Sequence, residues 1–303
     1  MTASSPARSP TGDATGTLAR GTFDVICAGE ARWAMRAPGD AFANQSARWR
    51  PGGGAVSAAL AMARRGLRVG LATALSDDRV GRALLVRIAA AGVDTGGVEL
   101  APSSEGLVFV EGLGASRQVL SFREAELPVA IPARWSSSLL LVSGLSPVVS
   151  YVGGLCKAAR AARRSGTLVV VDVNARRHAW AGRDPRAVLM LLREADVVRY
   201  SAGDAATLGL TAEALRLSLR ASTVLVASNG EGDAWAVGPF GEVARPRPRG
   251  RPIRARGSAG DAFTAALCAE LARAGAGLGG QAQVALWDRA LTLGHAAAAA
   301  SPG

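Results

Sequence analysis

Short apolar runs alternate with longer helix-like stretches along almost the whole chain, and this alternation constrains the fold more than any other feature. The runs are rich in β-branched residues, as buried strands are, and the stretches between them have the length and spacing of helices. Strands that alternate with helices form a mostly parallel sheet covered on both faces. We therefore predict a three-layer α/β/α fold with strands over 23–29, 69–74, 138–142, 167–173, 197–200 and 224–227, and helices over 54–65, 78–91, 152–164, 185–194, 212–220, 260–274 and 281–300.

Two pairs of shorter runs predict strand pairs, one over 234–237 and 242–244 and the other over 107–110 and 118–122. The segments near 31–50 and 104–128 could meet as a small accessory sheet, a β-lid. Because no repeat or linker divides the rest, residues 23–303 are predicted to form one domain. Residues 1–22 are rich in Ser, Thr, Ala, Pro and Gly, which predicts a disordered tail.

The formal charge of +11 raises the alternative of a nucleic-acid-binding protein. The arginines are scattered over most predicted helices, however, and the one local cluster, over 245–256, is interrupted by prolines. We therefore expect no nucleic-acid partner, although a basic surface would concentrate anionic substrates.

Cys27, Cys156 and Cys268 lie in apolar segments without metal-ligand spacing, which predicts buried, reduced thiols. His178 and His295 are the only histidines, so a His-rich metal site is excluded. No apolar run approaches the roughly 20 residues that span a bilayer, and residues 1–20 do not resemble a secretory signal. We expect a cytoplasmic protein without membrane contact.

The segment 256–263, RGSAGDAF, carries the strongest chemical signal. Its small residues precede a predicted helix, whose free amides and dipole favour an anion at its start. In the first turn, Asp261 could take a proton from an acceptor hydroxyl during phosphoryl transfer, or it could merely cap the helix. The segment alone leaves both readings open.

The same segment resembles the C-terminal signature of the ribokinase (PfkB-type) carbohydrate kinases, D-T-x-G-A-G-D. The resemblance implies a ribokinase-like fold, ATP and Mg²⁺ as cofactors, and Asp261 as the catalytic base. It also implies an anion hole at Gly257, Ser258, Ala259 and Gly260. Arg256 and Gly257 replace the usual threonine-containing pair, and Ala255 replaces the leading Asp.

Further motifs in the family's order extend the resemblance from Phe23 over nearly the whole chain. The stretch 51–57, PGGGAVS, resembles the N-terminal signature and implies contacts with the sugar, whereas 172–176, DVNAR, matches D-x-N-x-R near the phosphates. Ser201 and Asp204 stand at the family's N-x-x-E, which implies that Asp204 holds Mg²⁺ through water. The implied substrate-binding residues are Gly52, Gly53, Gly54 and Ser57, and the implied nucleotide-binding residues are Asn174, Arg176, Ser201, Ser228, Gly230, Gly232, Gly257 and His295.

Two departures concern the sugar: Ala34 replaces an Asp of the family, and Ser57 replaces an Asn. They suggest an unusual substrate or weakened activity. The stretch 121–124, SFRE, resembles one in 2-keto-3-deoxygluconate kinases, where Arg123 could pair with a carboxylate. We predict a kinase for such a sugar acid or for a fructose-like sugar, with a homodimer through the lid as a further possibility in this family. The alternative is an impaired member acting as a carbohydrate- or nucleotide-binding module; a dehydrogenase is disfavoured because no G-x-G-x-x-G follows the first strand.

Overall fold

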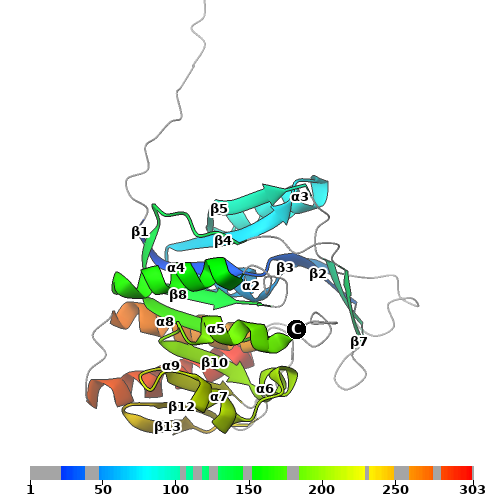
Figure 1. Ribbon diagram of the computed structural model, residues 1–303. Helices are drawn as coiled ribbons and strands as arrows, with labels where there is room; N and C mark the ends of the chain where they lie inside the picture. Colours follow the sequence, from blue (N-terminus) through cyan, green and yellow to red (C-terminus); the bar gives the residue numbers. More distant parts are fainter. Residues whose placement is uncertain are drawn as a thin grey trace, which may run out of the picture.

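The computed structural model describes residues 22–37, 48–102, 107–111, 118–122, 129–145, 152–175, 184–228, 232–248, 259–275 and 281–301 (Figure 1). Its main feature is a nine-stranded sheet in the order β13-β12-β11-β10-β9-β8-β1-β4-β5. The strands β11, β10, β9, β8, β1, β4 and β5 are parallel to one another. Strands β12 and β13 add an antiparallel hairpin at one edge. The strands are β1 (Thr22–Gly29), β4 (Val69–Ser76), β5 (Asp94–Ala101), β8 (Ser136–Ser143), β9 (Leu168–Asp172), β10 (Val197–Ser201), β11 (Val224–Ser228), β12 (Ala234–Gly238) and β13 (Gly241–Arg245).

Helices cover both faces of this sheet, so the predicted mostly parallel three-layer fold is confirmed (Figure 1). One core lies between the sheet and α2 (Gly54–Ala63), α3 (Arg79–Ala89), α8 (Ala259–Ala274) and α9 (Gln281–Ala300). The other lies under α4 (Val152–Arg164), α5 (Leu189–Leu192), α6 (Ala202–Leu208) and α7 (Ala212–Ser218). Burial on both faces explains why the central strands read as continuous apolar runs; β4 is buried at every position.

Local sequence explains where α3 begins and which side it buries. The carboxylate of Asp78 caps the helix by accepting hydrogen bonds from the backbone N–H groups of Val80 and Gly81, both at 2.8 Å. One turn apart, Leu84 and Ile88 are buried against the sheet. The spacing in the sequence predicts Val80 and Ala91 on the same face as Leu84 and Ile88, but both are exposed, because Val80 lies in the first turn and Ala91 lies beyond the end of the helix.

Four further strands form a second sheet in the order β3-β2-β6-β7, which we call the lid. Its strands are β2 (Arg32–Ala37), β3 (Arg48–Gly52), β6 (Leu107–Glu111) and β7 (Gln118–Phe122), all within the segments near 31–50 and 104–128. Figure 1 shows the lid standing at the side of the molecule toward which the arrowhead of β10 points. The carboxyl edge of the large sheet therefore faces the lid.

The sequence prediction missed helix α6 and was wrong in two further local respects. Strand β5 was missed, because its sequence DTGGVELA contains two glycines and lacks a continuous apolar run. The predicted helix over 185–194 is a 3₁₀ turn, η4 (Pro185–Val188), followed by the short helix α5. The three cysteines are free and buried, as predicted. Among the described residues, no helix has both the length and the apolar character needed to cross a membrane.

Candidate active site

The carboxyl ends of neighbouring parallel strands bring polar residues into one row. In the strand register, Ser143 at the end of β8 lies beside Asp172 at the end of β9. Asp172 in turn lies beside Arg199 of β10, and Ser201 lies beside Ser228 of β11. Ligands of open α/β sheets bind in a crevice outside the carboxyl ends of the strands. The row is therefore the first candidate for a functional site.

Asp261 lies in the first turn of α8, at the same edge. The side-chain amide of Asn174, just past β9, donates a hydrogen bond to Asp261 Oδ1 at 3.1 Å and lies 3.4 Å from Ser143 Oγ. Asn174 has a backbone φ of 37°, a left-handed conformation that Asn adopts more readily than most residues. This turn aims the amide at the carboxylate, so Asp261 is oriented from outside its own helix.

Behind Asp261 lies a buried polar network, which we call the arginine network; it consists of Asp172, Arg199, Asp204 and Ser228. The Arg199 guanidinium donates to Asp172 Oδ1 at 3.1 Å and to Ser228 Oγ at 2.7 Å, and it lies 4.0 Å from Asp204 Oδ2. Asp172, Arg199 and Asp204 are 1%, 6% and 1% exposed. Charges this deep in a protein are tolerated only when they are paired and hydrogen-bonded, so the network has to form as a unit.

Burial and charge act in opposite directions on this network. Desolvation raises the pKa of Asp172, although Arg199 partly offsets this. Burial lowers the pKa of the Arg199 guanidinium, but the carboxylates of Asp172, Asp204 and Asp261 outweigh that effect and raise it overall. Arg199 therefore stays a cation. A β-carbon on Gly260 would lie only 3.4 Å from Arg199 Nη2, so this positive charge stands directly beneath the first turn of α8.

A glycine turn between β3 and α2 closes the other side of the site. Gly53 has a φ of 92°, and a β-carbon there would overlap the carbonyl oxygen of Glu30. A β-carbon on Gly54 would overlap Ser143 Oγ and lie 2.6 Å from Asn174 Nδ2. Backbone therefore approaches Asn174 closely here, and only glycine fits this position.

The remaining predicted site residues are distributed around this centre. Ser201 and Asp204 form a capping box on α6, Ser57 is half-buried on α2, and Gly52 ends β3. His295 of α9 donates through Nε2 to the carbonyl oxygen of Arg245 at 3.1 Å and contacts the Phe263 ring edge-on. Gly232 lies just before β12, and Ala259 begins α8. Arg123, Arg176, Gly230, Ala255, Gly257 and Ser258 lie outside the described residues.

The described residues do not suit a resident metal ion. They contain no group of three or more His, Cys, Asp or Glu side chains that could hold one. Asp204 Oδ1 accepts from the backbone N–H of Ala175, and Oδ2 accepts from the N–H and hydroxyl of Ser201. A carboxylate with three short hydrogen bonds is a poor direct ligand. The expected role of Asp204, which is to hold a metal ion through water, stays a prediction.

Arg199 is the main site residue that sequence reasoning missed. The signal was a charged residue inside the otherwise apolar strand VVRYS. Such a residue is buried only with partners, and Asp172 at the end of the preceding strand and Asp204 shortly after β10 were acidic candidates in the sequence. Sequence reasoning also missed Thr264, whose hydroxyl donates to Asp172 Oδ2 at 3.1 Å. Thr264 lies in a mostly apolar part of α8, where no polar contact was expected.

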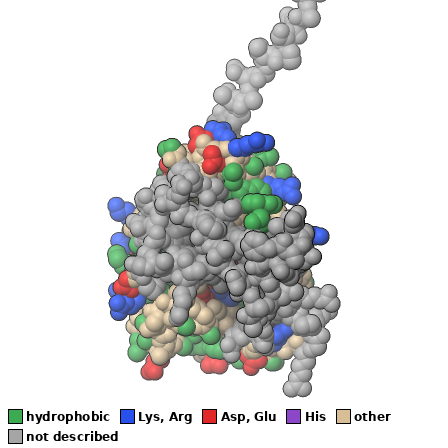
Figure 2. All heavy atoms as spheres, turned by 90° about the vertical axis from the view of Figure 1, so that its right-hand side faces the viewer, with side chains coloured by type: hydrophobic (Ala, Val, Ile, Leu, Met, Phe, Trp, Pro, Cys, Tyr) green, Lys and Arg blue, Asp and Glu red, His purple; other side chains and the backbone are tan. Residues whose placement is uncertain are grey.

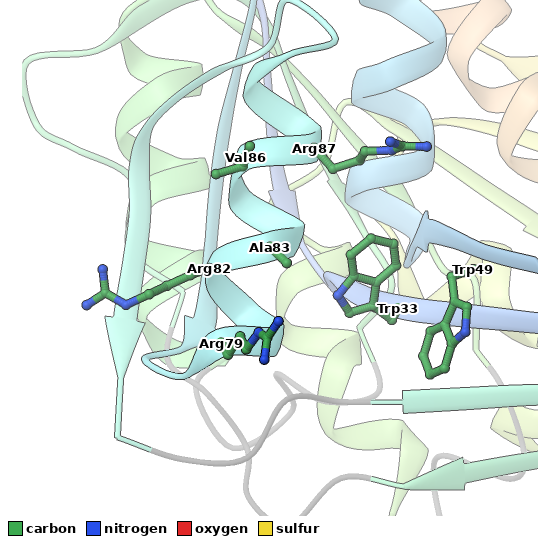
Figure 3. A pocket seen from close by; sticks show the side chains of 7 residues that line it. All are labelled: Trp33, Trp49, Arg79, Arg82, Ala83, Val86 and Arg87. Carbon is green, nitrogen blue, oxygen red and sulfur yellow. The ribbon is translucent and has the colours of Figure 1, made fainter.

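A hollow separate from this site lies between the lid and α3 and has a volume of about 650 Å³. Figure 3 shows Trp33 and Trp49 together on the lid side of the hollow, opposite the α3 side chains Arg79, Ala83 and Arg87. The indole N–H of Trp33 donates to the carbonyl oxygen of Val80 at 3.0 Å and so ties the lid to α3. Figure 2 views the lid side of the molecule, where hydrophobic and basic side chains lie next to each other beside the undescribed residues.

The chain matches the family model described as pfkB family carbohydrate kinase over residues 22–302. It belongs to this family. A 5-dehydro-2-deoxygluconokinase from Shouchella clausii is 29% identical over 246 residues, which cover 73% of this chain and 74% of that protein. One from Clostridium perfringens is 28% identical over 163 residues, 50% of this chain and 48% of that protein, so this pfkB-family chain matches about half the length of that relative.

Solved structures of kinases share the fold of this pfkB-family chain. A fructokinase from Xylella fastidiosa with bound ATP superposes with a TM-score of 0.75 at 23% identity, covering 92% of this chain and 93% of that one. An aminoimidazole riboside kinase from Salmonella enterica, complexed with its riboside and an ATP analogue, gives 0.71 at 23% identity and covers 92% of each chain. These likenesses confirm the ribokinase-like fold predicted from the motifs.

Proposed function

We propose that this pfkB-family chain transfers the γ-phosphoryl group of ATP to a hydroxyl group of a sugar or sugar acid. The observation that carries the proposal is the carboxylate of Asp261 in the first turn of α8, hydrogen-bonded to Asn174 at the carboxyl edge of the sheet. A kinase of this type needs a base for the acceptor hydroxyl beside backbone donors for the transferred phosphate. The start of a 16-residue helix supplies such donors.

In the proposed mechanism, Asp261 accepts the proton of the acceptor hydroxyl as its oxygen bonds to the γ-phosphorus and the bond to the ADP oxygen breaks. Asn174 holds the carboxylate in position through its 3.1 Å hydrogen bond. The amides at the start of α8 stabilise the charge that gathers on the phosphoryl oxygens. Magnesium bound to ATP would neutralise further charge on the phosphates.

For the acceptor, we propose a keto-deoxy sugar acid, with a fructose-like sugar as the second choice. Two relatives carry the name 5-dehydro-2-deoxygluconokinase, whose substrate is a sugar acid. The predicted contact of Arg123 with a substrate carboxylate agrees with this choice but lies outside the described residues. We also keep the homodimer through the lid as a proposal, to be checked by sedimentation.

The test is a coupled assay of ADP release with keto-deoxy sugar acids, ketoses, pentoses and nucleosides as acceptors. We expect turnover with at least one sugar or sugar acid, and an Asp261→Asn variant serves as the inactive control. Absence of turnover with every acceptor, in a protein that still binds ATP, would instead favour a carbohydrate- or nucleotide-binding module. Ala34, which has no polar side-chain atom where the family has an Asp, is the feature that keeps this alternative in the test.

A further inference from the structure

The two faces of the β2–β3 hairpin differ sharply in chemistry. Because β2 and β3 are antiparallel and side chains alternate, residues directly opposite each other share a face. Trp33 pairs with Pro51 and Met35 pairs with Trp49, so these form one face. Arg32, Ala34, Arg50 and Gly52 form the other face, on which Ala34 lies directly opposite Arg50; Arg48, two residues before Arg50, shares it.

The first of these faces is turned toward α3. Trp33 donates to the Val80 carbonyl, and Trp33 and Trp49 line the hollow against α3, as Figure 3 shows. The face with Arg50 must therefore point the opposite way. Arg32 on that face forms an ion pair with Glu30, and a β-carbon on Gly144, just past β8, would lie 3.2 Å from Glu30 Oε2. Gly52 approaches Ala34 from the same side, with a β-carbon position 3.1 Å from Ala34 Cβ.

The face with Arg50 thus continues into the Gly52–Gly54 turn, and Gly54 packs on Asn174, the partner of Asp261. Its described side chains offer cations and no group that could accept a hydrogen bond from a sugar hydroxyl. Glu30, which follows β1, is already paired with Arg32, and Ala34 is apolar. An acceptor bound beneath this hairpin therefore meets positive charge.

We propose that Arg50 determines acceptor specificity by binding an anionic group of the acceptor, a carboxylate or a phosphate ester, across from Ala34. This proposal rests on the proposed kinase function, which it deepens. Arg50 is half-buried, and partial burial together with the charge of Arg48 lowers the pKa of its guanidinium. An anion bound to the guanidinium would favour its charged form and so oppose both effects.

The proposal is tested with Arg50→Gln and a matched control, Arg87→Gln, on exposed α3 at the other side of the hairpin. Acceptors are a keto-deoxy sugar acid, a sugar phosphate, and neutral sugars of the same carbon skeletons. For Arg50→Gln we expect kcat/KM to fall about ten- to a hundredfold with one of the two anionic acceptors, the usual effect of losing a charge-assisted hydrogen bond. The anion that shows this loss identifies the group bound. Values for neutral acceptors and the KM for ATP should stay unchanged.

A second variant guards against a loss caused by misfolding. In Ala34→Asp, a carboxylate faces Arg50 across the hairpin and should neutralise it, which lowers kcat/KM for the anionic acceptor while Arg50 is still present. Equal losses with anionic and neutral acceptors, or a raised KM for ATP in place of the acceptor effect, would overturn the proposal.

Thermal shifts with each anionic acceptor separate this proposal from the kinase function. If the wild type turns over no acceptor but is stabilised by a sugar acid or phosphate in an Arg50-dependent way, anion binding by Arg50 stands and the kinase function fails. Turnover of neutral acceptors alone, with no Arg50-dependent effect, would leave the kinase function standing and remove this proposal.

Discussion

The two ends of the candidate site are built in opposite ways. At the phosphate end, Asp172, Arg199 and Asp204 are almost fully buried and bonded to one another. At the acceptor end, the β2–β3 hairpin presents a half-buried Arg50 and an Ala34 without polar atoms. The first end is stabilised as a unit, so a change to one member leaves another charge unpaired. The side chains of the second end are only partly buried, so they can change with the acceptor at less cost to the fold.

This difference predicts its largest effect at Asp261, where loss of the base should affect chemistry alone. In Asp261→Asn we expect kcat to fall about 10²- to 10⁴-fold, the usual contribution of a positioned base. The amide oxygen can still accept the Asn174 hydrogen bond, so stability and nucleotide affinity should hardly change. Steady-state kinetics and calorimetric ATP binding measure this, with Asp77→Asn before α3 as control. A loss of less than tenfold would assign Asp261 to capping α8.

The next effect concerns the arginine network. In Arg199→Met, two buried carboxylates lose their cation, and we expect the free energy of unfolding to fall by about 3–5 kcal/mol. The exposed α3 arginine in Arg87→Met should change it by no more than about 0.5 kcal/mol. Denaturant titration of both variants provides the comparison. If the two variants were equally stable, the phosphate end would not depend on this network.

The smallest effect lies at the junction of the two ends. A methyl group at Gly54 would collide with Ser143 and Asn174, so Gly54→Ala should cost about 1–3 kcal/mol and lower kcat as Asn174 moves. Gly154→Ala on α4 is the matched control, because a β-carbon there meets no atom within 4 Å. That change should raise helix stability by up to about 1 kcal/mol. Full activity in Gly54→Ala would show that the junction is not rigid.

The same contrast explains how much was predictable from sequence. The central strands were predicted because burial on both faces makes them continuous apolar runs, whereas β5, at the sheet edge, needs no such run. Asp261 and Asn174 were found from short motifs at a helix start and a strand end. Their contact across 87 positions, and the pairing of Arg199 with residues of two neighbouring strands, appear only once the sheet aligns the strand ends.

The opposite faces of the β2–β3 hairpin were also beyond sequence reasoning. The segment near 31–50 was expected to join an accessory sheet, but its two strands were not located in the sequence, because they are short and carry arginine and tryptophan together. Only the register, with Ala34 opposite Arg50, separates the aromatic face from the basic one.

The most direct test of the account is a crystal structure of the wild-type protein with an unreactive ATP analogue and an acceptor selected in the ADP-release assay. The account predicts an acceptor hydroxyl oxygen within about 2.6–3.2 Å of an Asp261 carboxylate oxygen, with the γ-phosphate against the start of α8. An acceptor bound away from Asp261, or a γ-phosphate remote from that helix start, would contradict it.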